Sequence, residues 1–189
     1  MCSAAQRRAI ALQLAYLLVR DVSEESWSGG LLVTDRRGLP LDFRYVEPIH
    51  PSRLQKLIYG SALKRYLLLD AIAATLLKAA NPNAEWIFTS DPMLLELNGE
   101  ISGRFVAIGN GEKKPLNGVG EWRAEGAGNI ILQIRPTGPP VQLVFEASSE
   151  KETEKIAQEL SELSHDMDFA EPLDRVGEAL IEICRNGRD

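Results

Sequence analysis

The residues best suited to chemistry lie close together between positions 50 and 56. His50 can act as an acid or a base near neutral pH. Ser52, Arg53 and Lys56 would add a hydroxyl and two cations at the start of a helix, where free backbone N–H groups attract anions. The spacing therefore predicts a cradle for a phosphate or a carboxylate. A capped helix with basic surface residues is the simpler alternative, because His50 has no carboxylate or nucleophile beside it in the sequence.

Basic residues are concentrated in the same part of the chain. Between residues 36 and 65, seven basic residues oppose two acidic ones, whereas thirteen acidic residues oppose five basic ones from 146 to 189. Each block can be a solvated face. Alternatively, the basic block is a patch for an acidic partner or nucleic acid, although a net charge of −6 and a pI of 5.1 disfavour strong nonspecific nucleic-acid binding. This patch adds three predicted binding residues: Arg36, Arg37 and Arg44.

The sequence contains no linear motif for catalysis, a cofactor or a metal. The glycine-rich run at 109–114 fits neither a Walker A loop nor a dinucleotide fingerprint, and no G-x-S-x-G elbow occurs. Cys2 and Cys184, even with His50 and His165, lack the spacing of zinc ligands. We therefore expect no catalytic residue, no cofactor and no metal. Unpaired thiols indicate a reducing, cytoplasmic environment.

A sheet must position these residues. A β-hairpin is predicted over 29–46, where strand-like runs flank an Asp-Arg-Arg-Gly turn at 35–38. The apolar run at 9–19 is predicted to be a buried strand, with a short helix as the alternative, because it is too short to span a membrane and no signal-peptide cleavage site follows it. The stretch 109–128 is expected to be a surface loop. Further strands are expected at 86–89, 104–108, 130–134 and 141–145.

Helices complete the predicted fold. One long helix from 52 to 80 would cover a face of the sheet, with Gly60 weakening its middle. The order strand, helix, strand allows a crossover that makes the two strands parallel. Asp91 before Pro92 is expected to be the N-cap of a short helix, although a carboxylate after a buried strand can also be a ligand site.

The last forty residues contain two amphipathic helices. Ser149 and Glu152 form a capping box at the start of the first helix, and the tight connection favours an αα-hairpin. The predicted fold class is α+β, with a mixed, mostly antiparallel sheet of about six strands, one long covering helix and this C-terminal αα-hairpin. The predicted division is a core domain at 1–148 and an acidic helical pair at 149–189 packed on that core.

The missing catalytic motifs favour a non-catalytic protein-interaction or regulatory accessory subunit with a protein partner. One alternative is an enzyme or ligand-binding module for a phosphate- or carboxylate-bearing substrate at the 50–56 turn. A second alternative is a nucleic-acid-associated protein that uses the basic 36–65 segment. No membrane partner is expected, and homodimerisation through the C-terminal helices is a further hypothesis.

Overall fold

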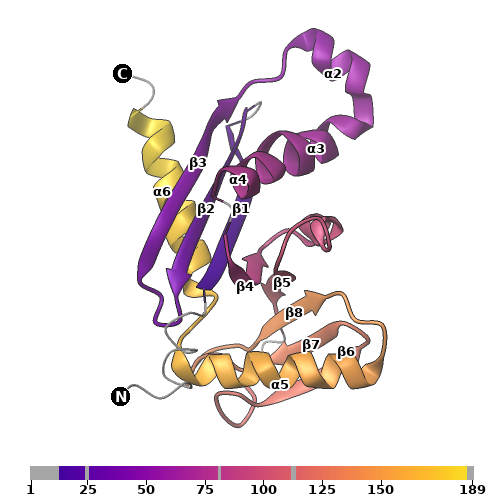
Figure 1. Cartoon of the computed structure of the whole chain (residues 1–189), viewed down its shortest axis with the longest axis vertical. Helices are drawn as coiled ribbons and strands as arrows, with labels where there is room; N and C mark the ends of the chain where they lie inside the picture. The colour runs from indigo at the N-terminus through magenta and orange to yellow at the C-terminus, as the bar shows by residue number, and fades with distance from the viewer. Residues whose placement is uncertain (1–12, 24–25, 81, 112–113, 187–189) are drawn as a thin grey trace.

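A single mixed sheet forms the frame of the protein. The computed structural model describes residues 13–23, 26–80, 82–111 and 114–186. Their strands form one eight-stranded sheet in the order β3-β2-β1-β4-β5-β8-β7-β6, so the predicted α+β class is confirmed with more strands than the six expected (Figure 1). The strands are β1 (Gln13–Ser23), β2 (Ser26–Asp35), β3 (Pro40–Ile49), β4 (Ala84–Thr89), β5 (Arg104–Asn110), β6 (Trp122–Gly126), β7 (Asn129–Leu132) and β8 (Val141–Phe145).

The pairing of neighbouring strands changes twice across the sheet, from antiparallel to parallel and back to antiparallel. β1, β2 and β3 form an antiparallel meander, and the predicted turn between β2 and β3 closes as expected, with the Gly38 N–H donating to the Asp35 carbonyl at 3.0 Å. β4 and β5 run parallel to β1, which confirms the predicted crossover. β8, β7 and β6 then continue antiparallel. The parallel strands therefore lie in the middle of the sheet.

β6 lies inside the stretch that was expected to be a loop. Only its first residue, Trp122, is packed against the core, and the four residues after it are exposed. Without apolar alternation, the strand has no signature in the sequence, and its pairing with β7 alone defines it. Trp122 is consequently a packing residue at the edge of the core.

β1 is buried on both of its faces. Leu14 and Tyr16 belong to one apolar cluster, and Ala15 and Leu17 belong to the cluster on the opposite face. A strand covered on both sides is a continuous apolar run in the sequence, which is the pattern that predicted a buried strand here. The part of the predicted strand at 9–12 lies outside the described residues.

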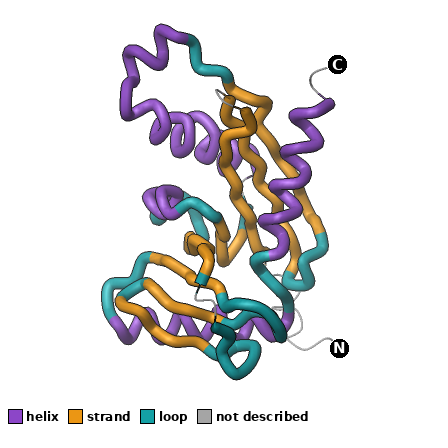
Figure 2. The backbone as a smooth tube through the Cα atoms, turned by 180° about the vertical axis from the view of Figure 1, so that it is seen from behind, coloured by secondary structure: helices purple, strands orange, loops and turns teal. Residues whose placement is uncertain are grey.

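The C-terminal helices cover the first of these faces. α5 (Glu150–Asp166) and α6 (Glu171–Asn186) both contribute to the cluster that contains Tyr16. They lie crosswise and do not form the predicted αα-hairpin: α6 lies along β1 and β2, and α5 crosses the region of β6 and β7 (Figures 1 and 2). Phe169 in the connection stacks on Phe88 with 4.9 Å between ring centroids. Each apolar stripe thus covers its own part of the sheet.

The predicted long helix is divided into unequal parts. Its segments are α2 (Arg53–Tyr59), η1 (Gly60–Ala62), α3 (Leu63–Tyr66), the π-helical η2 (Leu67–Ala73) and α4 (Ala74–Ala80). Buried residues occur in η2 and α4 only, so the covering helix begins at Leu67. Asp70 faces solvent, as expected for a helix edge. In the described part of the chain, no helix is long and apolar enough to cross a membrane.

Gly60 separates the two parts. Its φ of 51° and ψ of −129° end α2, and its N–H donates to the Lys56 carbonyl. This backbone conformation suits glycine because a Cβ would strain it. We call residues 53–66 the arm. The arm leaves the end of β3 and extends away from the sheet before the chain returns along α4 (Figure 1).

η2 packs so closely on β2 at Gly29 that a larger residue there should destabilise the protein. A Cβ added at Gly29 of β2 would overlap Cγ2 of Ile72 and lie 3.1 Å from the Leu18 carbonyl oxygen. We expect Gly29→Ala to lower the free energy of unfolding by about 1–3 kcal/mol, because the helix must shift from the sheet. Gly109→Ala in β5 is the control, since an added Cβ there has its nearest neighbour at 4.0 Å. Denaturant unfolding should find the control within about 0.5 kcal/mol of the parent, and equal effects would contradict this packing.

Candidate functional site

The predicted cradle at 50–56 is a capped helix start on the arm. The Ser52 Oγ accepts from the Gln55 N–H at 3.2 Å, and the Gln55 Oε1 accepts from the Ser52 N–H at 2.8 Å. These two bonds occupy donors that an anion would need. α2 buries none of its residues, and His50 and Arg53 are exposed. The capped-helix interpretation describes this segment, and any binding by Arg53 or Lys56 would take place on a protruding surface.

The other three predicted binding residues lie in ion pairs. Arg36 bonds Asp166 of α5 at 2.5 Å. Arg37 pairs with Asp35 at 2.9 Å, and Arg44 pairs with Asp42 at 3.0 Å. β3 is ten residues long, so roughly 30 Å separates the hairpin turn from the arm. The structure therefore divides the basic 36–65 block into a hairpin region with paired charges and the arm.

The arm keeps an uncompensated positive charge. Residues 53–66 include four basic residues and no acidic one. Arg65 pairs with Glu96 of η3 (Pro92–Leu97), which ties the base of the arm to the core. Arg53 and Lys64 have no acidic partner among the residues that the structure describes. The arm is thus a basic protrusion that leaves the carboxyl end of β3, at the end of the sheet where β1 also ends.

Asp91 lies just beyond the carboxyl end of β4, beside a point where the parallel neighbour β1 still continues. Leu17 of β1 is opposite Thr89 of β4, and Asp91 follows two residues later. Its Oδ1 accepts from the Met93 N–H at 2.9 Å, which confirms the predicted N-cap with Pro92 in the first turn of η3. Carboxyl ends of parallel strands are a common ligand position in open sheets.

A metal centre at this edge is not supported by the residues present. Metal-dependent phosphodiester chemistry needs several oxygen or nitrogen ligands around each ion. Within the described ranges, no group of three or more His, Cys, Asp or Glu residues could hold a metal ion. No metal-dependent step is therefore assigned to Asp91.

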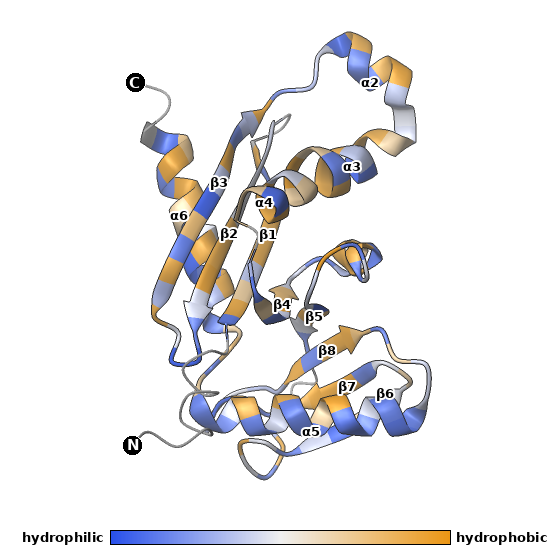
Figure 3. Ribbon diagram, viewed as in Figure 1, coloured by the Kyte–Doolittle hydropathy of each residue, from blue (hydrophilic) through white to orange (hydrophobic). Residues whose placement is uncertain are grey.

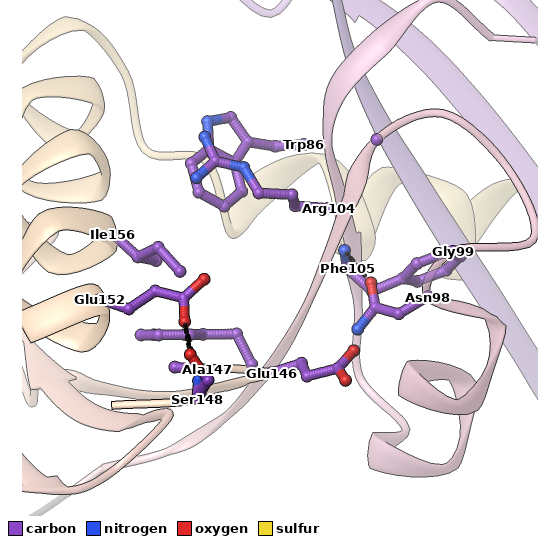
Figure 4. Close-up of a pocket in the computed structure, with 12 residues that line it drawn as sticks. Trp86, Asn98, Gly99, Arg104, Phe105, Glu146, Ala147, Ser148, Glu152 and Ile156 are labelled. Atoms are coloured by element: carbon purple, nitrogen blue, oxygen red, sulfur yellow. Dashed lines mark hydrogen bonds between the residues drawn. The ribbon is translucent and has the colours of Figure 1, made fainter. Parts of the chain in front are cut away.

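A cavity of about 420 Å³ lies at the other end of the parallel strands, beside the amino ends of β4 and β5 (Figure 4). It is bounded by the loop after η3, the end of β8 and the start of α5. Apolar side chains form part of its wall, and two glutamates and one arginine supply the charge. The lining residues are Trp86, Asn98, Gly99, Gly103, Arg104, Phe105, Phe145, Glu146, Ala147, Ser148, Glu152 and Ile156.

Arg104 is fixed on one side of this cavity. Its guanidinium carbon lies 3.8 Å from the centroid of the Trp86 ring, the residue opposite it in the β4–β5 register. Glu159 bonds it at 2.5 Å and Glu85 at 3.3 Å. A guanidinium that is stacked and paired in this way lines the cavity without attracting an anion strongly, because its charge is already compensated.

Glu152 faces Arg104 across the cavity. Its Oε2 accepts from the Ser148 hydroxyl at 2.6 Å and from the Ser148 N–H at 2.8 Å. These bonds, the hydroxyl first, lower the pKa of the Glu152 carboxyl, so it is ionised at neutral pH. The predicted capping box is present in a shifted form: Ser149 caps the Glu152 N–H, but the glutamate bonds Ser148. With Glu146 also on the wall, the cavity repels phosphate and suits a hydrogen-bond donor or a cation.

Comparison with known proteins identifies a shared fold. No protein-family model matches the sequence, and a search of curated proteins gives no match. Human ENDOV is similar in structure with a TM-score of 0.58 and 11% identity over 99% of this chain and 91% of that one. The endonuclease V of Streptomyces avermitilis is similar with a TM-score of 0.54 and 12% identity over 93% and 80%. Marinitoga piezophila Argonaute has a TM-score of 0.49 and 9% identity over 87% of this chain, which spans 27% of its length.

This similarity corrects the leading hypothesis from the sequence. A non-catalytic protein-interaction or regulatory accessory subunit is the wrong class, because the fold is the one found in endonuclease V. The missing motifs were misleading, since a fold of this kind is defined by strand order and carries no local signature in this chain. A protein partner has no support from the comparison either.

The hydrogen bonds of Glu152 allow a pH prediction. Ser148→Ala removes the hydroxyl donor and keeps the backbone N–H, so the pKa of the Glu152 carboxyl should rise part of the way to its ordinary value. A lowered pKa favours folding at neutral pH, and this contribution is lost as the pH falls through the folded-state pKa. Carbon-detected NMR titration measures the change. Ser161→Ala, which removes a bond to the Gly120 carbonyl, should leave the Glu152 titration unchanged.

The stacked arginine allows a second prediction. Arg104→Ala removes the contact with Trp86 and leaves Glu85 and Glu159 without their partner, so we expect a loss of about 1 kcal/mol in the free energy of unfolding. Arg44→Ala breaks an exposed pair with Asp42 and should cost less than about 0.5 kcal/mol. Denaturant unfolding of both variants compares them. Equal losses would show that Arg104 is an ordinary surface residue.

Proposed function

We propose that this protein binds nucleic acid. The observation that carries the proposal is the shared fold, which extends over 99% of the chain with human ENDOV at a TM-score of 0.58. Proteins with this fold include endonuclease V, whose name states its action on nucleic acid. Nucleic-acid binding thus takes the place of the accessory-subunit hypothesis. The basic surface that would bind nucleic acid is the arm, because Arg36, Arg37 and Arg44 are paired with acidic residues.

The charge distribution supports one direction of approach. The acidic helices α5 and α6 lie on the sheet face that contains Tyr16, whereas η2, α4 and η3 lie on the other face. η2 and α4 continue the chain from the arm, and η3 is joined to it by the Arg65–Glu96 pair. Phosphates would be attracted to Arg53 and Lys64, which have no acidic partner among the described residues. Screening at physiological salt, with a Debye length of about 8 Å, weakens repulsion from the acidic face. Nucleic acid is thus expected on the arm side.

The cavity at Arg104 does not belong to this surface. Its two glutamates disfavour phosphate, and it lies at the amino ends of β4 and β5, away from Asp91. The proposed site therefore comprises the arm and the neighbouring carboxyl ends of β1 and β4.

Binding and its salt dependence test the proposal. Fluorescence anisotropy with labelled oligonucleotides should show binding at 50 mM salt that weakens steadily up to 200 mM, because binding releases counterions. Arg53→Gln with Lys64→Gln should weaken binding and lower the magnitude of the logarithmic salt slope by about 1 or more. Lys114→Gln with Lys151→Gln removes the same charge elsewhere and should have a smaller effect.

Two results would oppose the proposal: no binding of any oligonucleotide at 50 mM salt, or equal effects of the two double variants. The same samples incubated with Mg²⁺ or Mn²⁺ and run on a denaturing gel show whether strands are cut. Cleavage that disappears in Asp91→Asn would extend the proposal from binding to processing and place Asp91 in the site.

A further inference from the structure

The arm exposes an apolar side as well as a basic one. Leu54, Leu57 and Ile58 are 65%, 73% and 72% exposed, more than the other large apolar residues in the part of the chain that the structure describes. They recur at i, i+3 and i+4, so they share one side of α2. Figure 3 shows apolar residues along this part of the ribbon, far from the core. Tyr59 and Tyr66, with ring centroids 4.7 Å apart, extend the apolar surface to the base of the arm.

The fold itself does not account for these side chains. α2 has no buried residue, its start is closed by the Ser52–Gln55 capping box, and Gly60 ends it. Adjacent large apolar residues that remain in solvent mark a binding surface more often than isolated ones do. The arm therefore has an apolar side that the described chain leaves uncovered.

The charge of the arm favours nucleic acid over a second copy of the chain as the molecule that binds its apolar side. A second copy would bring two arms with four basic and no acidic residues each into contact. A seven-residue helix is roughly 10 Å long and offers too little area for a stable dimer, which needs about 1,200 Å². Nucleic acid fits both sides of the arm, because its phosphates match the basic side and its bases have apolar faces.

The apolar side further selects the form of the nucleic acid. In a duplex the base faces are stacked on one another and are inaccessible to a side chain. In an unpaired strand they are free to lie on apolar and aromatic residues. Resting on the proposed function, we propose that the arm binds unpaired nucleic acid, with Arg53 and Lys64 at the phosphates and Leu54, Leu57 and Ile58 against the faces of the bases.

The test compares one variant on two substrates. The triple change Leu54→Ser, Leu57→Ser and Ile58→Ser should weaken binding of a single-stranded 20-mer by about tenfold at fixed salt. Binding of the matching duplex should change little, and the salt slope should stay the same because no charge is altered. Thermal unfolding should also be unchanged, since none of the three residues is buried. Leu41→Ser, at a residue 54% exposed on β3, is the control and should leave single-strand binding unchanged.

The outcomes separate this inference from the proposed function. If the parent protein binds oligonucleotides and the triple variant binds the single strand equally well, the arm inference fails while nucleic-acid binding stands. If the parent binds no oligonucleotide, the proposed function fails. A third outcome also overturns the inference. The parent would form dimers or sediment with anionic lipid vesicles, and the triple variant would lose this property while it still binds the single strand normally. The apolar side would then bind a second copy or a lipid surface.

Discussion

Burial of β1 on both faces is the constraint on which the rest of the structure depends. Because Leu14 and Tyr16 face one layer while Ala15 and Leu17 face the other, helices must cover both sides of the sheet. α6 meets this need on one side, where Val176 comes so close to Gly30 that a Cβ there would lie 2.9 Å from it. η2 meets it on the other side through Ile72 and Gly29. The parallel pairing of β4 with β1 agrees with this burial, since parallel strands occur in sheets that are covered on both faces.

The demands of this core also explain why the arm is free. Only residues from Leu67 onward are needed over the sheet, and the π-helical turn there buries Leu67, Leu68 and Leu69 in succession. None of residues 53–66 is buried, so the exposed apolar side chains of the arm are unexplained by folding stability. Gly60 lets the chain turn back from α2 toward the sheet without strain. The segment predicted to be one long helix is thus divided into the exposed arm and the covering helix that packs on the sheet.

Features set by neighbouring residues could be predicted from the sequence, whereas those set by distant contacts could not. The Asp35–Gly38 turn, the Asp91 cap and the Ser149 cap depend on residues within four positions and were predicted correctly. Arg36 and Asp166 are 130 positions apart, so the loss of Arg36 from the basic patch could not be foreseen. Trp86 and Arg104 meet only because β4 and β5 pair in one register. β6 gave no signal at all, since its side chains past Trp122 are exposed.

The two polar regions of the molecule differ in what they can accept. At the cavity, Arg104 is stacked and paired, and the remaining charge comes from Glu146 and Glu152, so a phosphate is repelled. On the arm, Arg53 and Lys64 have no acidic partner among the described residues. The sheet face next to the arm is covered by η2 and α4, whereas the acidic helices α5 and α6 cover the opposite face. The sheet therefore lies between the acidic helices α5 and α6 on one face and the layer that continues into the arm on the other. That separation permits an acidic protein to offer a polyanion one favourable side, provided that the strand approaches along the arm.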